Sequence, residues 1–142
     1  MNIVERAEQI AREAHAGQTD KAGRPYIEHV ERVAAAVADD PDACAVAWLH
    51  DVIEDCAPHY WFKMCEIMPF HVCDAANDLT RHESIPAGEY YAQIRYSPLA
   101  LKVKLADIAD NSAEWRLAHL DEKTQSRLRR KYAKARQALG IA

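Results

Sequence analysis

Apolar residues recur every three or four positions along most of this chain, which is the spacing of one face of an α-helix. In the first such segment the apolar positions are Val4, Ala7, Ile10, Ala11 and Ala14. No stretch sustains the strict apolar–polar alternation that is typical of a half-buried strand. The pattern therefore predicts an all-α fold, organised as a single compact helical bundle.

Short segments rich in glycine, proline and capping residues divide this pattern into helices. The loop from Gly17 to Pro25 contains two glycines and a proline. Asp40-Pro41 and Ser97-Pro98 each place a capping side chain before a proline in the first helical turn. The predicted helices cover about residues 3–16, 26–38, 41–56, 58–68, 70–79, 89–96, 98–115 and 121–139. The helix over 41–56 is the most apolar, so we expect it at the centre of the bundle.

The composition is that of a soluble globular protein. The chain has 142 residues, 49% of them hydrophobic and 28% charged, and we expect one domain over residues 1–142. A net charge of −4 makes a nucleic-acid partner unexpected, whereas a homo-oligomer stays open. No apolar run approaches the roughly 18 residues of a membrane span. The charged, amphipathic start is not a secretory signal, so we expect a cytoplasmic protein with its four cysteines reduced.

The first candidate for chemistry is the segment His50–Asp55, at the end of the most apolar predicted helix. Four of its six side chains are ionisable, and burying them is costly unless a cation or another partner compensates their charge. On a helix, adjacent His50 and Asp51 lie about 100° apart, close enough to hold one metal ion between them. Glu54 and Asp55 follow one turn later, near such an ion but not on it.

Two further segments place polar residues among apolar ones. Asp107 is flanked by apolar residues on a predicted helix, and His29 lies early on the helix that follows the Gly17–Pro25 loop. Together with His50 and Asp51 they form a mixed nitrogen–oxygen ligand set. With water, this set suits an octahedral divalent ion such as Mn²⁺ better than a closed structural zinc site. The alternative is that the residues are separate and lie on helix surfaces without a metal.

Four motifs occur in order along nearly the whole chain: His15-Ala16-Gly17-Gln18, Lys21–His29, Leu49–Asp55, and Lys104–Asp107 with Asn111. In this order they resemble the HD superfamily of metal-dependent phosphohydrolases. Within it, the chain looks most like the RelA/SpoT-type (p)ppGpp hydrolase domain and the stand-alone small alarmone hydrolases. The resemblance implies an HD-domain helical bundle and removal of the 3′-pyrophosphate from guanosine tetra- or pentaphosphate.

The resemblance also implies a role for each matched residue. A metal ion, usually Mn²⁺, would be bound by His29, His50, Asp51 and Asp107. Glu54 and Asp55 match the acidic pair that positions and deprotonates the attacking water. Lys21 matches a residue that contacts substrate phosphate, and Asn111 matches a residue near the ribose and phosphates.

Two segments depart from the family pattern. The residue before Lys21 is Asp20, where the family usually has an arginine that stacks on guanine, and Ile108-Ala109-Asp110 replaces the usual Arg-Leu-His. An acid cannot stack on a base as a guanidinium group does, so an adenosine alarmone such as (p)ppApp is a further candidate substrate. If Asp20 accounts for a lost guanine preference, Asp20→Arg is expected to restore part of it.

Two other functions stay open on the same metal site. One is a different HD phosphohydrolase acting on nucleotides, such as a 5′-nucleotidase or phosphatase, which would release orthophosphate instead of pyrophosphate. The other is a non-catalytic nucleotide sensor. Glu54 and Asp55 count against a sensor, because mere binding has no physical need for that acidic pair.

Overall fold

A computed structural model describes residues 1–141, which form ten α-helices and no strand. The helices are α1 (Ile3–Ala14), α2 (Ile27–Ala36), α3 (Pro41–Leu49), α4 (Val52–Asp55), α5 (His59–Ile67), α6 (Phe70–Asp78), α7 (Ala87–Tyr96), α8 (Pro98–Asn111), α9 (Glu114–Leu117) and α10 (Glu122–Ala138). This confirms the all-α prediction. Over the same residues, no helix combines the length and the apolar character that a membrane crossing requires.

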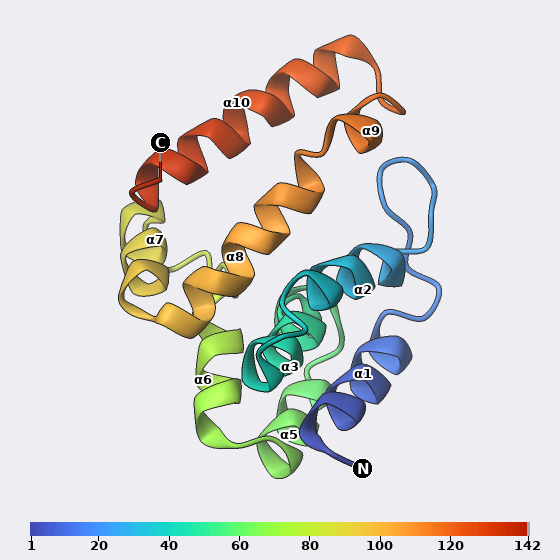
Figure 1. The fold of residues 1–142 in the computed structure, drawn as a ribbon, viewed down its shortest axis with the longest axis vertical. Helices are drawn as coiled ribbons and strands as arrows, with labels where there is room; N and C mark the ends of the chain where they lie inside the picture. Colours follow the sequence, from blue (N-terminus) through green and yellow to red (C-terminus); the bar gives the residue numbers. More distant parts are fainter. Residues whose placement is uncertain (142) are drawn as a thin grey trace.

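Helix α3 lies at the centre of the fold (Figure 1), as its composition predicts. Every residue from Ala43 to Leu49 is buried, and α1, α2, α6 and α8 pack against this helix. A helix that is apolar on all sides can be stable only when other elements surround it. Helix α7 packs against α8 and α10, and α10 runs along the outside of the molecule. The four cysteines are free thiols, as the sequence predicts.

The predicted helix over 41–56 is wrong in its length, because α3 ends at Leu49. The His50 imidazole nitrogen Nδ1 lies 2.6 Å from the carbonyl oxygen of Ala47, which is the acceptor that a continuing helix offers to the N–H of Asp51. Asp51 has φ −107° and ψ 0°, outside regular helix, and the short helix α4 begins after it. The metal-binding candidates His50 and Asp51 therefore lie in a turn between two helices.

The predicted helix over 98–115 is also divided, into α8 and α9. The hydroxyl of Ser112 donates a 2.6 Å hydrogen bond to the carbonyl oxygen of Ile108, which also accepts from the Ser112 N–H. Serine hydroxyls that bond to nearby carbonyls compete with the helical ladder. Ala113 is extended, and α9 then turns back toward the loop between α1 and α2 (Figure 1).

Candidate metal centre

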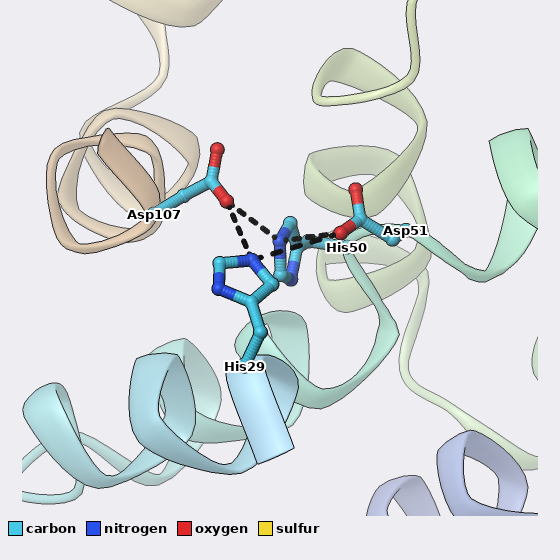
Figure 2. Close-up of side chains that lie close together, drawn as sticks. All are labelled: His29, His50, Asp51 and Asp107. Carbon is cyan, nitrogen blue, oxygen red and sulfur yellow. Dashed lines mark hydrogen bonds and ion pairs between the residues drawn. The ribbon is translucent and has the colours of Figure 1, made fainter. Parts of the chain in front are cut away.

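Four side chains from three parts of the chain meet in the interior (Figure 2). His29 comes from α2, His50 and Asp51 from the turn after α3, and Asp107 from α8. One ligand atom of each residue lies within 4.8 Å of the ligand atoms of the other three. These are the four residues to which the sequence assigns metal binding. A single ion can contact all four side chains at this spacing.

The two imidazoles present their Nε2 atoms to the two carboxylates. His29 Nε2 lies 3.0 Å from Asp107 Oδ1 and 4.0 Å from Asp51 Oδ2. His50 Nε2 lies 3.0 Å from Asp51 Oδ2 and 3.2 Å from Asp107 Oδ1. His29, His50 and Asp107 are 1%, 3% and 6% exposed, so bulk water screens these charges poorly. Two carboxylates and two imidazoles are ligand types that a divalent metal ion accepts.

The protonation of the centre follows from this packing. Burial alone would lower the pKa of His50, but Asp51 and Asp107 raise it well above the ordinary histidine value. Burial alone would also lower the pKa of His29, but its hydrogen bonds to Asp107 and Asp110 raise that pKa above the ordinary value. Burial would raise the pKa of Asp107, yet its hydrogen bonds to His29 and His50 lower it strongly. Without a metal, charged imidazoles therefore balance the ionised carboxylates.

Surrounding side chains hold each carboxylate in place. The hydroxyl of Tyr26 donates a 2.5 Å hydrogen bond to Asp51 Oδ2, and burial followed by the charge of Asp51 raises the pKa of that hydroxyl. Lys104 Nζ lies 3.3 Å from Asp107 Oδ2. The side-chain amide of Asn111 donates to Asp107 Oδ1 at 3.1 Å. Asn111, which the resemblance places near the substrate, therefore touches a candidate metal ligand directly.

The predicted catalytic pair, Glu54 and Asp55, lies on α4 and is more exposed than the four candidate ligands. Partial burial and then the charge of Asp51 raise the pKa of both carboxyl groups. Asp55 Oδ2 accepts a 3.3 Å hydrogen bond from the Gln18 amide, whose oxygen lies 2.7 Å from Nδ1 of buried His15. A raised pKa near a metal centre is typical of a carboxylate that exchanges protons.

A cavity of about 560 Å³ opens beside the centre and includes both predicted substrate residues, Lys21 and Asn111, in its wall. Trp115 and Tyr132 supply aromatic surface, and Tyr26 connects the wall to Asp51. Burial and then the nearby charges of Arg127 and Lys131 lower the pKa of Lys21. A cavity that combines aromatic surface with clustered cations suits an anionic aromatic molecule such as a nucleotide.

The structure links the two departures from the family pattern through Arg116. Its Nη2 lies 3.2 Å from Asp20 Oδ2, and its Nη1 lies 2.9 Å from Asp110 Oδ2. Asp20 also accepts hydrogen bonds from the backbone N–H groups of Ala22 and Arg24, both at 2.9 Å. The Asp20 carboxylate therefore shapes its own loop and joins it to α9.

Sequence reasoning missed several side chains that contact the centre or its acidic pair: Gln18, Tyr26, Lys104, Asp110 and Arg116. Three of these residues, Gln18, Tyr26 and Lys104, belong to the motifs quoted above. Their membership in those motifs is the sequence signal that could have marked them as part of the site. Nothing in the sequence singles out Arg116, because its contacts depend on how α9 folds back.

Comparison with known proteins finds a similar fold and several similar sequence segments, although no family model matches the chain. A SpoT ortholog from a metazoan, described as hydrolysing ppGpp, superposes with a TM-score of 0.79 over 98% of this chain and 86% of its own, at 22% sequence identity. The chain has the fold of that hydrolase. The shared fold agrees with the expected all-α architecture.

Curated relatives are similar over a shorter segment. The guanosine-3′,5′-bis(diphosphate) 3′-pyrophosphohydrolase of Vibrio cholerae is 50% identical over 50 residues, which is 33% of this chain and 7% of that protein. The bifunctional (p)ppGpp synthase/hydrolase SpoT of Escherichia coli is 46% identical over 54 residues, or 36% and 8%. The matched segments thus span less than a tenth of these longer proteins. Over about a third of its length, the chain is therefore similar in sequence to (p)ppGpp hydrolases of the SpoT type.

Proposed function

We propose that the protein is a metal-dependent hydrolase that removes the 3′-pyrophosphate from a guanosine or adenosine alarmone nucleotide of the (p)ppGpp or (p)ppApp type, working in the cytoplasm. The convergence of His29, His50, Asp51 and Asp107 on one buried point carries this proposal. The similarity to ppGpp 3′-pyrophosphohydrolases supports the substrate class.

The four converging side chains fit a divalent ion, and we propose Mn²⁺. The two imidazoles and two carboxylates are the ligand types that this ion accepts, and they leave room for water and substrate oxygens. When bound, a divalent ion polarises a phosphoryl oxygen and makes a neighbouring water more acidic. Such an ion would also compensate the charges of buried Asp107 and partly buried Asp51, whose partners are otherwise charged imidazoles.

Glu54 and Asp55 are proposed to position the attacking water and accept its proton. Both carboxyl groups have a raised pKa, which brings proton acceptance closer to neutral pH. Water attacks the phosphorus atom attached to the 3′ oxygen, and the bond between that oxygen and phosphorus breaks. The products are pyrophosphate and a nucleotide with a free 3′ hydroxyl.

The cavity beside the centre is proposed to hold the rest of the nucleotide. Lys21 would contact a phosphate and Asn111 the ribose and phosphates, both from the cavity wall. Arg127 and Lys131 add positive charge near Lys21, so this end of the cavity attracts a second anionic group of the substrate. A nucleotide with phosphates on both its 3′ and 5′ sides meets both requirements.

The decisive experiment combines a substrate screen with two variants. Purified protein loaded with Mn²⁺ is incubated with ppGpp, ppApp, NADPH and common nucleotides, and products are separated by chromatography. We expect pyrophosphate from the 3′ side of ppGpp or ppApp. Orthophosphate alone would indicate a nucleotidase or phosphatase, and binding without any product would indicate a sensor.

Asp51→Ala is expected to abolish both Mn²⁺ binding and turnover, because Asp51 is one of four converging ligands. Glu54→Gln should keep Mn²⁺ affinity and lower kcat by about 10² to 10⁴. Asp42→Ala is the matched control, since Asp42 pairs with His71 at the other end of α3. An Asp51→Ala protein with parental turnover would refute the proposed centre.

A further inference from the structure

Asp110 contacts the candidate metal ligand His29 at the ring nitrogen that faces away from the other three ligands. Its Oδ2 lies 2.6 Å from His29 Nδ1, and its side chain is 12% exposed. Because His29 turns Nε2 toward Asp107 and Asp51, only that atom can reach an ion between them. An imidazole that ligates through Nε2 keeps its proton on Nδ1, and this N–H requires an acceptor. Asp110 supplies it.

The second imidazole is held differently. His50 Nδ1 lies 2.6 Å from the backbone carbonyl oxygen of Ala47. A backbone acceptor is present whatever side chain occupies position 47, whereas the acceptor for His29 depends on the residue at position 110. The orientation of His29 is therefore the one that a side-chain substitution can change.

Asp110 is itself fixed by two guanidinium groups. Arg32 Nε lies 2.8 Å from Oδ1, and Arg116 Nη1 lies 2.9 Å from Oδ2. Arg116 Nη1 also lies 3.4 Å from His29 Nδ1. A guanidinium group has no acceptor, so Arg116 cannot replace Asp110 as the partner of the Nδ1 proton. Without Asp110, these contacts favour the tautomer with the proton on Nε2, and in that tautomer Nε2 cannot bind the proposed ion.

We infer that Asp110 is a positioning residue, which holds His29 in the tautomer and orientation that present Nε2 to the metal. Arg32 and Arg116 keep its carboxylate against His29. The inference rests on the proposed metal centre and adds to it a residue that neither the motifs nor the comparisons assign. Loss of such an outer partner lowers metal affinity by about 10- to 100-fold.

The test is calorimetric titration of the metal-free protein with Mn²⁺ alone, comparing Asp110→Ala with Asp110→Asn. Both variants remove the same charge, but asparagine keeps a side-chain carbonyl oxygen. His29 and Arg116 both donate at the Oδ2 position, so this oxygen is expected to occupy it. We expect Asp110→Ala to weaken Mn²⁺ binding about 10- to 100-fold and Asp110→Asn to recover most of that loss.

Asp20→Asn is the matched control, because it removes a negative charge that also pairs with Arg116 but does not touch His29. Its Mn²⁺ affinity should equal that of the parent. Equal losses in Asp110→Ala and Asp110→Asn would assign the effect to charge alone and overturn the inference. Parental affinity in Asp110→Ala would overturn it as well.

Folding and the metal centre itself are checked separately. If Asp110→Ala fails to show a cooperative thermal transition, Asp110→Ala combined with Arg32→Ala replaces it, compared with Arg32→Ala alone. The double substitution removes the guanidinium group that would be left unpaired. A parent that does not bind Mn²⁺ would refute the proposed function, whereas a parent that binds Mn²⁺ no better than Asp110→Ala refutes only the role of Asp110.

Discussion

Metal binding is expected to release protons, because the imidazoles of the metal-free centre lie against carboxylates. Asp107 and Asp51 raise the pKa of His50, and Asp107 and Asp110 raise that of His29, in both cases against the opposite effect of burial. A protonated Nε2 cannot ligate, so the proton on each imidazole must leave before the ion binds. The carboxylates stay ionised and contribute no protons, since the pKa of Asp51 and of Asp107 is lowered.

The size of the effect follows from the number of imidazoles at the centre. Two rings, His29 and His50, set an upper limit of two protons released per ion. Each released proton raises the apparent affinity about tenfold per pH unit, so the affinity should increase by up to about a hundredfold per unit. This dependence ends where the pH exceeds the raised pKa of the rings.

Stability without metal should change with pH in the opposite direction. A histidine whose pKa is raised by folding stabilises the protein fully below its ordinary pKa, and this contribution is lost as the pH rises through the raised value. The metal-free protein should therefore lose stability above neutral pH. The Mn²⁺-loaded protein should keep its stability over the same range, because tighter binding of the ion offsets that loss.

Calorimetry in two buffers of different ionisation enthalpy measures the protons released directly. Titrations with Mn²⁺ at several pH values between about 6 and 8 then test whether the affinity changes by the same number. Thermal unfolding with and without Mn²⁺ supplies the second readout. Release of no protons near neutral pH would refute the charged state that we derive for His29 and His50.

Two further substitutions test the surroundings of the centre. Asp20→Arg removes the acceptor of two backbone N–H groups and places a second guanidinium group near Arg116, so urea unfolding should show that the free energy of unfolding falls by about 2 kcal/mol or more. Unchanged stability would contradict the loop-anchoring role of Asp20. The kcat/KM values of this variant for ppGpp and ppApp then test guanine preference. Gln18→Glu places a carboxylate against Asp55 and should raise the Asp55 pKa further, which moves the low-pH limb of the kcat profile up by about one pH unit. Gln18→Asn, whose shorter side chain loses the hydrogen bond but adds no charge, should move the limb less. If the limb does not move in Gln18→Glu, Asp55 is not the proton acceptor.

Local signals predicted the starts of α3 and α8 correctly. Asp40 accepts from the N–H groups of Asp42 and Ala43, and Ser97 accepts from that of Ala100, each before a proline in the first turn. These caps involve residues at most three positions apart, so the sequence contains the whole interaction. The helix ends at Leu49 and Asn111 were missed, because there a side chain competes with the backbone for a carbonyl oxygen.

The candidate ligands were predictable one by one, but their surroundings were not. Charged residues within apolar helices mark His50, Asp51 and Asp107 as groups that need partners. Which partner each one has depends on packing between distant segments. Arg116 contacts Asp20 across 96 positions, and His29 contacts Asp110 across 81. No periodicity or motif contains information about pairs of this kind.

The break after α3 is what gives the centre its geometry. In a continuous helix, the side chains of His50 and Asp51 would project in directions about 100° apart. The turn instead places His50 Nε2 3.0 Å from Asp51 Oδ2, with both groups facing Asp107 on α8. The hydrogen bond that fixes the His50 ring uses the Ala47 carbonyl oxygen, which is the same group that the break leaves available. The contact between His50 and the Ala47 carbonyl oxygen therefore both ends α3 and orients a candidate metal ligand. A helix that continued through residue 51 would use this carbonyl oxygen for the N–H of Asp51 and would leave the His50 ring without it.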